Sequence, residues 1–496
     1  MNTKIIRRSF GLTLLLTTLL ACNAEFDNPV GDETHFNSGS ADLSHFVSLG
    51  DSLTAGYADA ALYLHGQENS YPAILATQFA KVGGGDFNQP LVSDNLGGLL
   101  FGGNANPAFP NRLILNAETE SPEPIAGIST TEVFSPLTGA FNNMGVPGAK
   151  SYHLITPGYG DPAGVSASPA TANPYFARFA SEANTTMLSD AVSQQPSFFV
   201  LWVGNNDVLS YASSGGTGTN QLGNLHPSTY GSDDLTDPNL FASIYSQVVT
   251  ALSAAGGKGV LINIPDISAI PFFTTVPFNA LPLDQETVDL LTSGYAEYNA
   301  GLQAAFQGSL ITSDEQQERS ITFSVGQNAV VIEDESLTDL TGLTLPSIRQ
   351  ATANDLILLT TASKIGEPVS EGSTSLWGVN TPLADEDVLT PMEIDLITTA
   401  RLAFNASIKG IADSNDNILF VDVAELLNEV QQGFSYGTGS INATYATGDA
   451  FSLDGVHLTA RGYSVVSNEI IDTINTGFQA NIPKVDPGAY SSISFK

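Results

Sequence analysis

FFVLWV, at residues 198–203, is an unbroken apolar run whose length suits one strand of a sheet that is buried on both faces. It leads directly into the polar turn Gly204–Asp207. Three other short apolar runs have the same character, at His45–Leu49, Gly259–Ile264 and Ile418–Val423. Because sheets covered on both faces are mostly parallel, these runs predict four strands of one parallel sheet.

Helical patterns separate these strands. They lie at Pro238–Ala255, Gln285–Phe306, Ala400–Ala412 and Thr459–Phe478. Strands that alternate with helices predict βαβ units with right-handed crossovers, and therefore an α/β fold in which helices cover both faces of the sheet.

Three regions interrupt this alternation. Residues 97–144 and 157–196 are rich in Gly, Pro, Asn and Ala and predict long loop insertions. Residues 308–390 carry strand patterns of their own, at Ile321–Val325 and Val330–Asp334, and predict an inserted subdomain.

Composition bounds the kinds of partner. Of the 496 residues, 42% are hydrophobic and 14% are charged, which is enough apolar material for a large core. Sixteen Lys+Arg against 51 Asp+Glu give a formal net charge of −35. A chain this acidic repels phosphate backbones and anionic lipid surfaces, so nucleic acid is excluded as a partner and neutral substrates are favoured.

The first 22 residues determine the expected compartment. Lys4, Arg7 and Arg8 precede an apolar run that is too short to span a bilayer, as in a secretory signal. The run ends in Leu19-Leu20-Ala21-Cys22, which resembles the lipobox of bacterial lipoproteins, and Cys22 is the only cysteine. The alternative is an ordinary signal peptide with an incidental cysteine. The lipobox implies cleavage before Cys22 and its lipidation, and Asn23 at the next position suggests the outer membrane of the cell envelope.

These patterns give a domain plan. We expect a lipoprotein signal peptide at 1–21, a flexible tether from Cys22 at 22–42, one α/β domain at 43–479 with its insertion at about 308–390, and a C-terminal tail at 480–496. Contact with the membrane is expected through the lipid anchor only. The sequence does not indicate an oligomeric state.

Two short motifs supply a serine, an aspartate and a histidine at the ends of predicted elements. Gly50-Asp51-Ser52-Leu53 places a serine directly after the first strand, at the start of a helical segment, where unsatisfied backbone N–H groups favour developing negative charge. Asp454-Gly455-Val456-His457 precedes the last helix, and its spacing lets Asp454 turn back onto the imidazole. A serine nucleophile needs such a base, and the base needs such a carboxylate.

Two further motifs supply candidate donors for an oxyanion. Asn206 follows the strand at 198–203, at the edge of the sheet where open α/β proteins place their sites. Gly148, in Asn143–Gly148, has no Cβ, so its N–H can approach a substrate closely. Each motif alone is common, but the four together, in this order and each at a strand end or helix start, are specific.

The four motifs resemble the blocks of the GDSL, or SGNH, hydrolase family, which occur in the order Ser52, Gly148, Asn206 and His457. The stretch Gly50–Tyr57 is close to that family's first block. The resemblance implies a flavodoxin-like three-layer α/β/α sandwich and ester hydrolysis through an acyl-enzyme. It assigns Ser52 as nucleophile, His457 as general base and Asp454 as its orienting carboxylate. It also assigns the oxyanion hole to the N–H groups of Ser52 and Gly148 and the amide of Asn206.

The expected function is therefore that of a serine esterase or lipase acting on neutral acyl esters, such as lipid esters, aryl esters or O-acetyl groups on glycans. A carbohydrate O-deacetylase of the same fold and a non-catalytic envelope binding lipoprotein remain as alternatives. No cofactor and no metal are expected, because the other histidines are scattered without ligand spacing: His35, His45, His65, His153 and His226.

Overall fold

The computed structural model describes residues 35–254, 256–437 and 439–496, and it is built on a five-stranded parallel sheet. The strand order is β16-β9-β8-β1-β7. The bounds are Phe46–Gly50 for β1, Asn143–Gly145 for β7, Phe198–Trp202 for β8, Lys258–Ile262 for β9 and Ile418–Val421 for β16. Numbered along the chain and read from the β7 edge, this is the order 2-1-3-4-5 of flavodoxin-like folds. The predicted fold class is confirmed.

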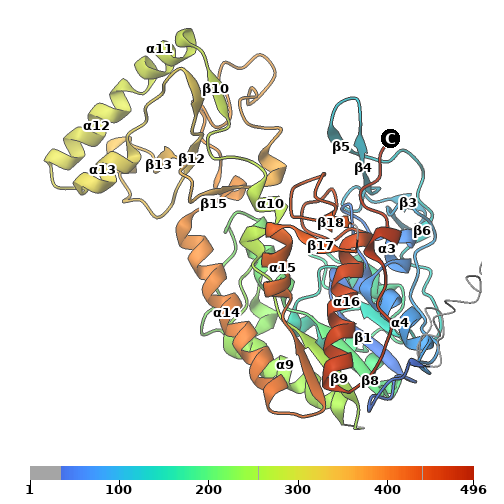
Figure 1. The fold of residues 1–496 in the computed structure, drawn as a ribbon. Coiled ribbons are helices and arrows are strands. Elements are labelled where there is room, and N and C mark those ends of the chain that lie inside the picture. Colours follow the sequence, from blue (N-terminus) through green and yellow to red (C-terminus); the bar gives the residue numbers. More distant parts are fainter. Residues whose placement is uncertain (1–34, 255, 438) are drawn as a thin grey trace, which may run out of the picture.

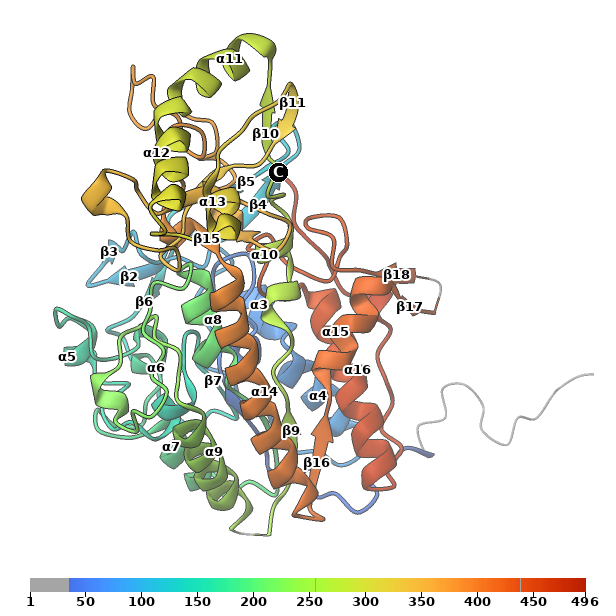
Figure 2. The same ribbon diagram turned by 90° about the vertical axis from the view of Figure 1, so that its left-hand side faces the viewer.

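Helices cover both faces of the sheet (Figures 1 and 2). One layer contains α4 (Tyr71–Ala80) and α16 (Ala460–Gly477), and the other contains α7 (Met187–Ser193), α9 (Pro238–Ser253) and α14 (Pro391–Asp413). Every residue of β8 is buried. Its apolar run is therefore what a central strand with helices on both sides requires.

The fifth strand, β7, begins at the end of the region that was expected to be an irregular loop, 97–144, and extends one residue beyond it. Its three residues, Asn143, Met144 and Gly145, have little intrinsic strand propensity. They pair with Ser48, Leu49 and Gly50 of β1, and the Asn143 side chain donates to the carbonyl of Thr54 at 3.0 Å. Tertiary pairing therefore forms this strand, which explains why the local pattern did not predict it.

The loop regions contain other short elements that lie outside the main sheet. The chain forms two small sheets in the connection from β1 to β7. One consists of β2 (Leu99–Phe101), β3 (Asn104–Ala105) and β6 (Thr131–Glu132), and the other of β4 (Leu113–Asn116) and β5 (Ser121–Pro124). Besides the helices of the two layers named above, the main body has shorter helices: α2 (Ser52–Ala55), α3 (Leu64–Glu68), α5 (Pro162–Val165), α6 (Pro174–Ala177), α8 (Asn205–Ser213), α10 (Pro271–Thr274) and α15 (Val423–Gln432).

A second folded unit, which we term the insert (residues 276–389), occupies the connection between β9 and α14 and projects beyond the N-terminus of α14 (Figure 1). Most of its buried apolar residues form clusters separate from the main core, whereas Leu358 and Leu389 pack in the main core. It contains α11 (Gln285–Gly294), α12 (Ala296–Gln307), α13 (Ser313–Arg319), β10 (Leu281–Leu283), β11 (Gly326–Asn328), β12 (Val331–Glu333), β13 (Ile348–Gln350), β14 (Leu356–Ile357) and β15 (Val388–Leu389).

The insert begins earlier than the expected start at 308. The helical pattern at 285–306, which we assigned to the layers around the main sheet, forms α11 and α12 of the insert. Leu291 of α11 and Leu302 of α12 bury their side chains in the insert's own clusters. Helical periodicity shows that a face is buried but not against which partner. The expected strand at Ile321–Val325 is also absent, and β11 follows it instead.

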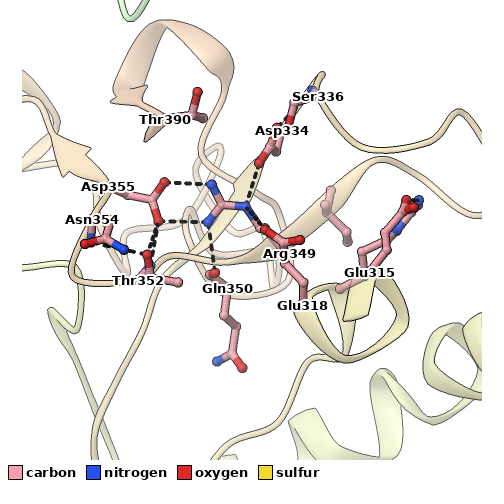
Figure 3. Close-up of polar contacts among 12 residues, drawn as sticks. Glu315, Glu318, Asp334, Ser336, Arg349, Gln350, Thr352, Asn354, Asp355 and Thr390 are labelled. Atoms are coloured by element: carbon pink, nitrogen blue, oxygen red, sulfur yellow. Dashed lines mark hydrogen bonds and ion pairs between the residues drawn. The ribbon is translucent and has the colours of Figure 1, made fainter. Parts of the chain in front are cut away.

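An almost fully buried arginine ties the insert together (Figure 3). The Arg349 guanidinium donates to Asp334 at 2.6 Å and to both carboxylate oxygens of Asp355, at 2.7 and 2.8 Å. These two carboxylates raise the pKa of Arg349, although its burial opposes the shift. A buried guanidinium with two carboxylate partners fixes how β12 and β13 sit against the turn before β14.

Both ends of the described chain pack against the main body. Asn37 and Asn481 exchange backbone hydrogen bonds, and Ala41 is buried in the main core. The expected tether, 22–42, therefore ends in ordered structure before residue 42, and the tail after 480 also contributes a buried residue, Ile482. The predicted signal peptide and the lipidation site Cys22 lie outside the described residues. Within those residues, no helix combines the length and apolarity needed to cross a membrane.

Candidate active site

Ser52 lies where β1 ends and α2 begins, at the carboxyl edge of the sheet. Asp51 caps this helix by accepting a hydrogen bond from the backbone N–H of Leu53 at 3.0 Å. Gly56 closes the same short helix in the left-handed region, at φ +82°. The strand, the cap and the glycine end together fix the orientation of the Ser52 side chain, which is 7% exposed.

The structure brings Ser52, His457 and Asp454 together in one hydrogen-bonded chain. The Ser52 hydroxyl lies 2.9 Å from Nε2 of His457, and Nδ1 of the same imidazole lies 2.9 Å from Oδ2 of Asp454. Ser52 and His457 are 405 residues apart in the sequence. These distances are those of a nucleophile, a base and an orienting carboxylate within hydrogen-bond reach.

Asp454 is held by donors on every side. Its Oδ1 accepts from the backbone N–H of Val456 and His457 at 2.9 and 2.8 Å, and its Oδ2 accepts from the N–H of Ala60 at 2.9 Å. Burial acts to raise the pKa of this carboxyl, but the His457 side chain and the backbone donors outweigh it and hold the pKa well below its usual range. Asp454 is therefore ionised at neutral pH and cannot rotate without losing several hydrogen bonds.

Gly148 and Asn206 emerge on either side of Ser52. β7 and β8 both neighbour β1, and the segments that follow them carry Gly148 and Asn206 respectively. Gly148 has φ +80°, a conformation that favours glycine. The Asn206 amide donates to the Ala149 carbonyl at 3.0 Å, which fixes the amide plane and leaves its second N–H to point elsewhere.

Asp207 locks these two segments to each other. Its fully buried carboxylate accepts from the hydroxyl of Ser151 at 2.7 Å and from the N–H of Ser151 at 2.8 Å. Burial raises the pKa of Asp207 in spite of these donors. Asp207, the last residue of the turn Gly204–Asp207, therefore stabilises the site through Ser151, a contact that its position in the motif did not predict.

Sequence reasoning assigned no role to three other residues near the site, Asp51, Asn205 and Tyr57. Nδ2 of Asn205 donates to Oδ2 of Asp51 at 2.9 Å, which ties the turn after β8 to the turn after β1. Burial raises the pKa of Asp51 to about 6. The Tyr57 ring packs against the His457 imidazole with their centroids 4.7 Å apart. Asp51, Asn205 and Tyr57 all lie within the quoted motifs, so the sequence marked them as near the site. Their contacts could not be predicted, because the partners are far away in the sequence.

An apolar cleft opens beside Ser52 and His457, and the sequence did not predict it. It encloses about 780 Å³ of space, its open mouth included. Four of its lining residues, Ser52, Trp202, Asn205 and His457, carry polar side-chain groups, and most of the others are aliphatic. The available signal was the spacing of Val423, Leu426, Leu427 and Val430, which is one face of a helix.

A group of three carboxylates lies at the base of the insert, on a different part of the molecule. Single oxygens of Glu335, Asp385 and Glu393 lie within 4.8 Å of one another, which is a spacing that could hold a cation. Glu393 also closes the capping box of α14, accepting from the N–H and hydroxyl of Thr390 at 2.7 and 2.9 Å. Burial raises the pKa of Glu393 to about 7 and that of Asp385 to about 6. Partial protonation therefore lets these groups sit together.

The comparisons with known proteins agree with this geometry at the level of the family. Residues 46–470 match the model of the GDSL-like Lipase/Acylhydrolase family, a span that reaches from β1 into α16 and includes all four motifs. Neither a curated protein nor a solved structure matches the chain. Because the match covers most of the sequence, the chain belongs to the family of GDSL-like lipases and acylhydrolases, and its general activity is acyl hydrolysis.

Proposed function

We propose that the protein is a serine carboxylic ester hydrolase that works through an acyl-enzyme on Ser52. The observation that carries this proposal is the continuous chain from the Ser52 hydroxyl through the His457 imidazole to the Asp454 carboxylate. With Asp454 ionised, Nδ1 of His457 must bear the proton of that hydrogen bond. Nε2 is then the acceptor for the Ser52 proton, which is the tautomer a general base needs.

In the first half of the reaction, Oγ of Ser52 attacks the ester carbonyl carbon and its proton passes to Nε2 of His457. The carbonyl oxygen becomes an oxyanion, for which we assign the N–H groups of Ser52 and Gly148 and the amide of Asn206 as donors. The bond to the alcohol oxygen then breaks, and that oxygen takes the proton from His457. The free alcohol leaves, and the acyl group stays bonded to Ser52.

In the second half, water attacks the same carbon and gives a proton to His457. The bond between Oγ and the acyl carbon breaks, Oγ takes the proton back, and a carboxylic acid leaves. Asp454 stabilises the imidazolium in both halves without taking its proton. The Tyr57 ring beside His457 limits the positions that the imidazole can adopt.

The test compares Ser52→Ala with the wild-type chain on p-nitrophenyl acetate, together with labelling by a fluorophosphonate. We expect loss of both hydrolysis and labelling in Ser52→Ala. Ser213→Ala is the matched control, because Ser213 is exposed near the end of α8 and its hydroxyl only donates to a backbone carbonyl. Equal activity of Ser52→Ala and wild type would remove Ser52 as the nucleophile.

A further inference from the structure

The apolar cleft runs between two facing helical stripes. Val423, Leu426, Leu427 and Val430 of α15 line one side, and Gly462, Val465 and Val466 of α16 line the other. The two helices stand side by side in Figures 1 and 2. Trp202, Pro265 and Val423 contribute from the carboxyl ends of β8, β9 and β16, and Ile441 and Phe451 contribute from the segment between the helices.

The lining offers almost nothing to a polar ligand beyond the reacting groups. His457 and Ser52 are already bonded to each other, Nδ2 of Asn205 donates to Asp51, and the Trp202 indole donates to the Asn263 carbonyl at 3.1 Å. Among the lining residues, Oδ1 of Asn205 is the one buried polar side-chain atom without a partner. The several hydroxyls of a sugar placed in the cleft would lose water and could gain only this acceptor, which costs free energy. A hydrocarbon chain would gain from the same surroundings.

We propose that this cleft holds an unbranched acyl chain of medium length, with its carboxyl carbon at Ser52, and that Leu427 and Val466 set the chain length. This proposal rests on the proposed function and specifies its substrate class. The stripe from Val423 to Val430 covers eight residues of helix, and the seven steps between its ends give a rise of about 10 Å. An extended chain of about eight carbons, at roughly 1.3 Å per carbon for 1.5 Å bonds, has the same length.

The acyl side of the ester fits better than the alcohol side. The acyl group stays bonded to Ser52 through both halves of the reaction, whereas the alcohol must leave and water must enter at His457. An apolar wall that extends from Ser52 suits the group that stays. Each methylene that the cleft removes from water adds up to about fourfold to kcat/KM if the contact is complete in the transition state.

The experiment measures kcat/KM of the full chain on p-nitrophenyl esters from acetate to dodecanoate, all below their micelle concentrations. We expect the value to rise at least thirtyfold from acetate to octanoate and to level off beyond about ten carbons. A second series keeps the acetyl group and lengthens the alcohol. A preference that follows the alcohol and not the acyl chain would overturn the assignment.

Two variants narrow the cleft from opposite walls, Leu427→Trp on α15 and Val466→Phe on α16. Each should lower the octanoate-to-acetate ratio of kcat/KM at least tenfold. Asn428→Trp is the matched control and should keep the wild-type ratio, because Asn428 is exposed on the same helix. A cooperative urea transition shows that a variant is folded, and having two walls to change keeps the test decisive if one variant does not fold.

The outcomes separate this proposal from the one on which it rests. A wild-type chain that hydrolyses all acyl lengths equally, in a Ser52-dependent manner, would overturn the acyl cleft and leave the serine hydrolase intact. The same holds if both narrowed variants keep the wild-type ratio. Hydrolysis that persists in Ser52→Ala would overturn the proposed function, and the cleft assignment with it.

Discussion

The substitution Gly455→Ala tests how closely Phe272 of α10 and Leu359 of the insert pack against the turn that carries Asp454 and His457. Gly455 lies between Asp454 and His457 at φ +72°, and its carbonyl accepts from the N–H of Phe272 at 2.9 Å. A Cβ at this position would lie 2.9 Å from Cδ2 of Leu359 in the insert and 3.0 Å from the Phe272 backbone nitrogen. The positive φ costs an alanine about 1–2 kcal/mol, and the forced contact adds about 1–3 kcal/mol.

The matched control is Gly372→Ala, since Gly372 has φ +77° and nothing within 4 Å of its Cβ position. Urea unfolding should show a loss of about 1–2 kcal/mol for Gly372→Ala and about 2–5 kcal/mol for Gly455→Ala. In p-nitrophenyl acetate hydrolysis, Gly455→Ala should lose at least tenfold in kcat, because a displacement of about 1 Å between reacting groups costs about a hundredfold. If the two variants are equally stable and equally active, these contacts with Phe272 and Leu359 do not constrain the turn.

Three further predictions concern the oxyanion, the acidic group and the insert. Asn206→Ala should lower kcat on p-nitrophenyl acetate by about 10²–10³ with KM nearly unchanged, and a rise in KM alone would contradict the donor role. The raised pKa of Glu393, about 7, means that its contribution to stability is present below about pH 4.5 and is lost as the pH rises through 7. With a chelator in the buffer, the free energy of unfolding of Glu393→Gln at pH 8 should therefore exceed that of wild type by up to about 3 kcal/mol. The difference should vanish near pH 4, and a difference independent of pH would contradict the raised pKa. Arg349→Met leaves two buried carboxylates unpaired and should destabilise the insert by about 3–5 kcal/mol, seen as faster proteolysis within 276–389, and an unchanged cleavage rate would contradict the role of the arginine.

The parts of the fold that sequence predicted are those whose signal is local. An apolar run such as 198–203 requires burial on both faces wherever it is placed, so β8 and the α/β class followed directly. The four motifs lie at strand ends and helix starts, and parallel strands bring such ends to one edge of the sheet. The placement of Ser52 near His457 therefore needed only the topology and not the details of packing.

The parts that sequence did not predict depend on partners that are distant in the chain. β7 exists because three residues without strand propensity meet the free edge of β1. The helices α11 and α12 have ordinary amphipathic faces, and only the insert's own clusters decide that these faces turn away from the main sheet. The cleft lies between α15 and α16. The apolar face of each helix, considered alone in the sequence, predicts a side buried in the core and not the wall of a cleft.

The wide separation of Ser52 and His457 also determines when activity first becomes possible. His457 lies 405 residues after Ser52, so ribosomes adding about 5–20 residues per second make it roughly 20–80 s later. A nascent chain that extends only to Ile441 would already contain all five strands of the sheet, yet it would lack the His457 imidazole. In the proposed mechanism, hydrolysis therefore begins only after the segment that carries His457 has been made and has packed beside Ser52.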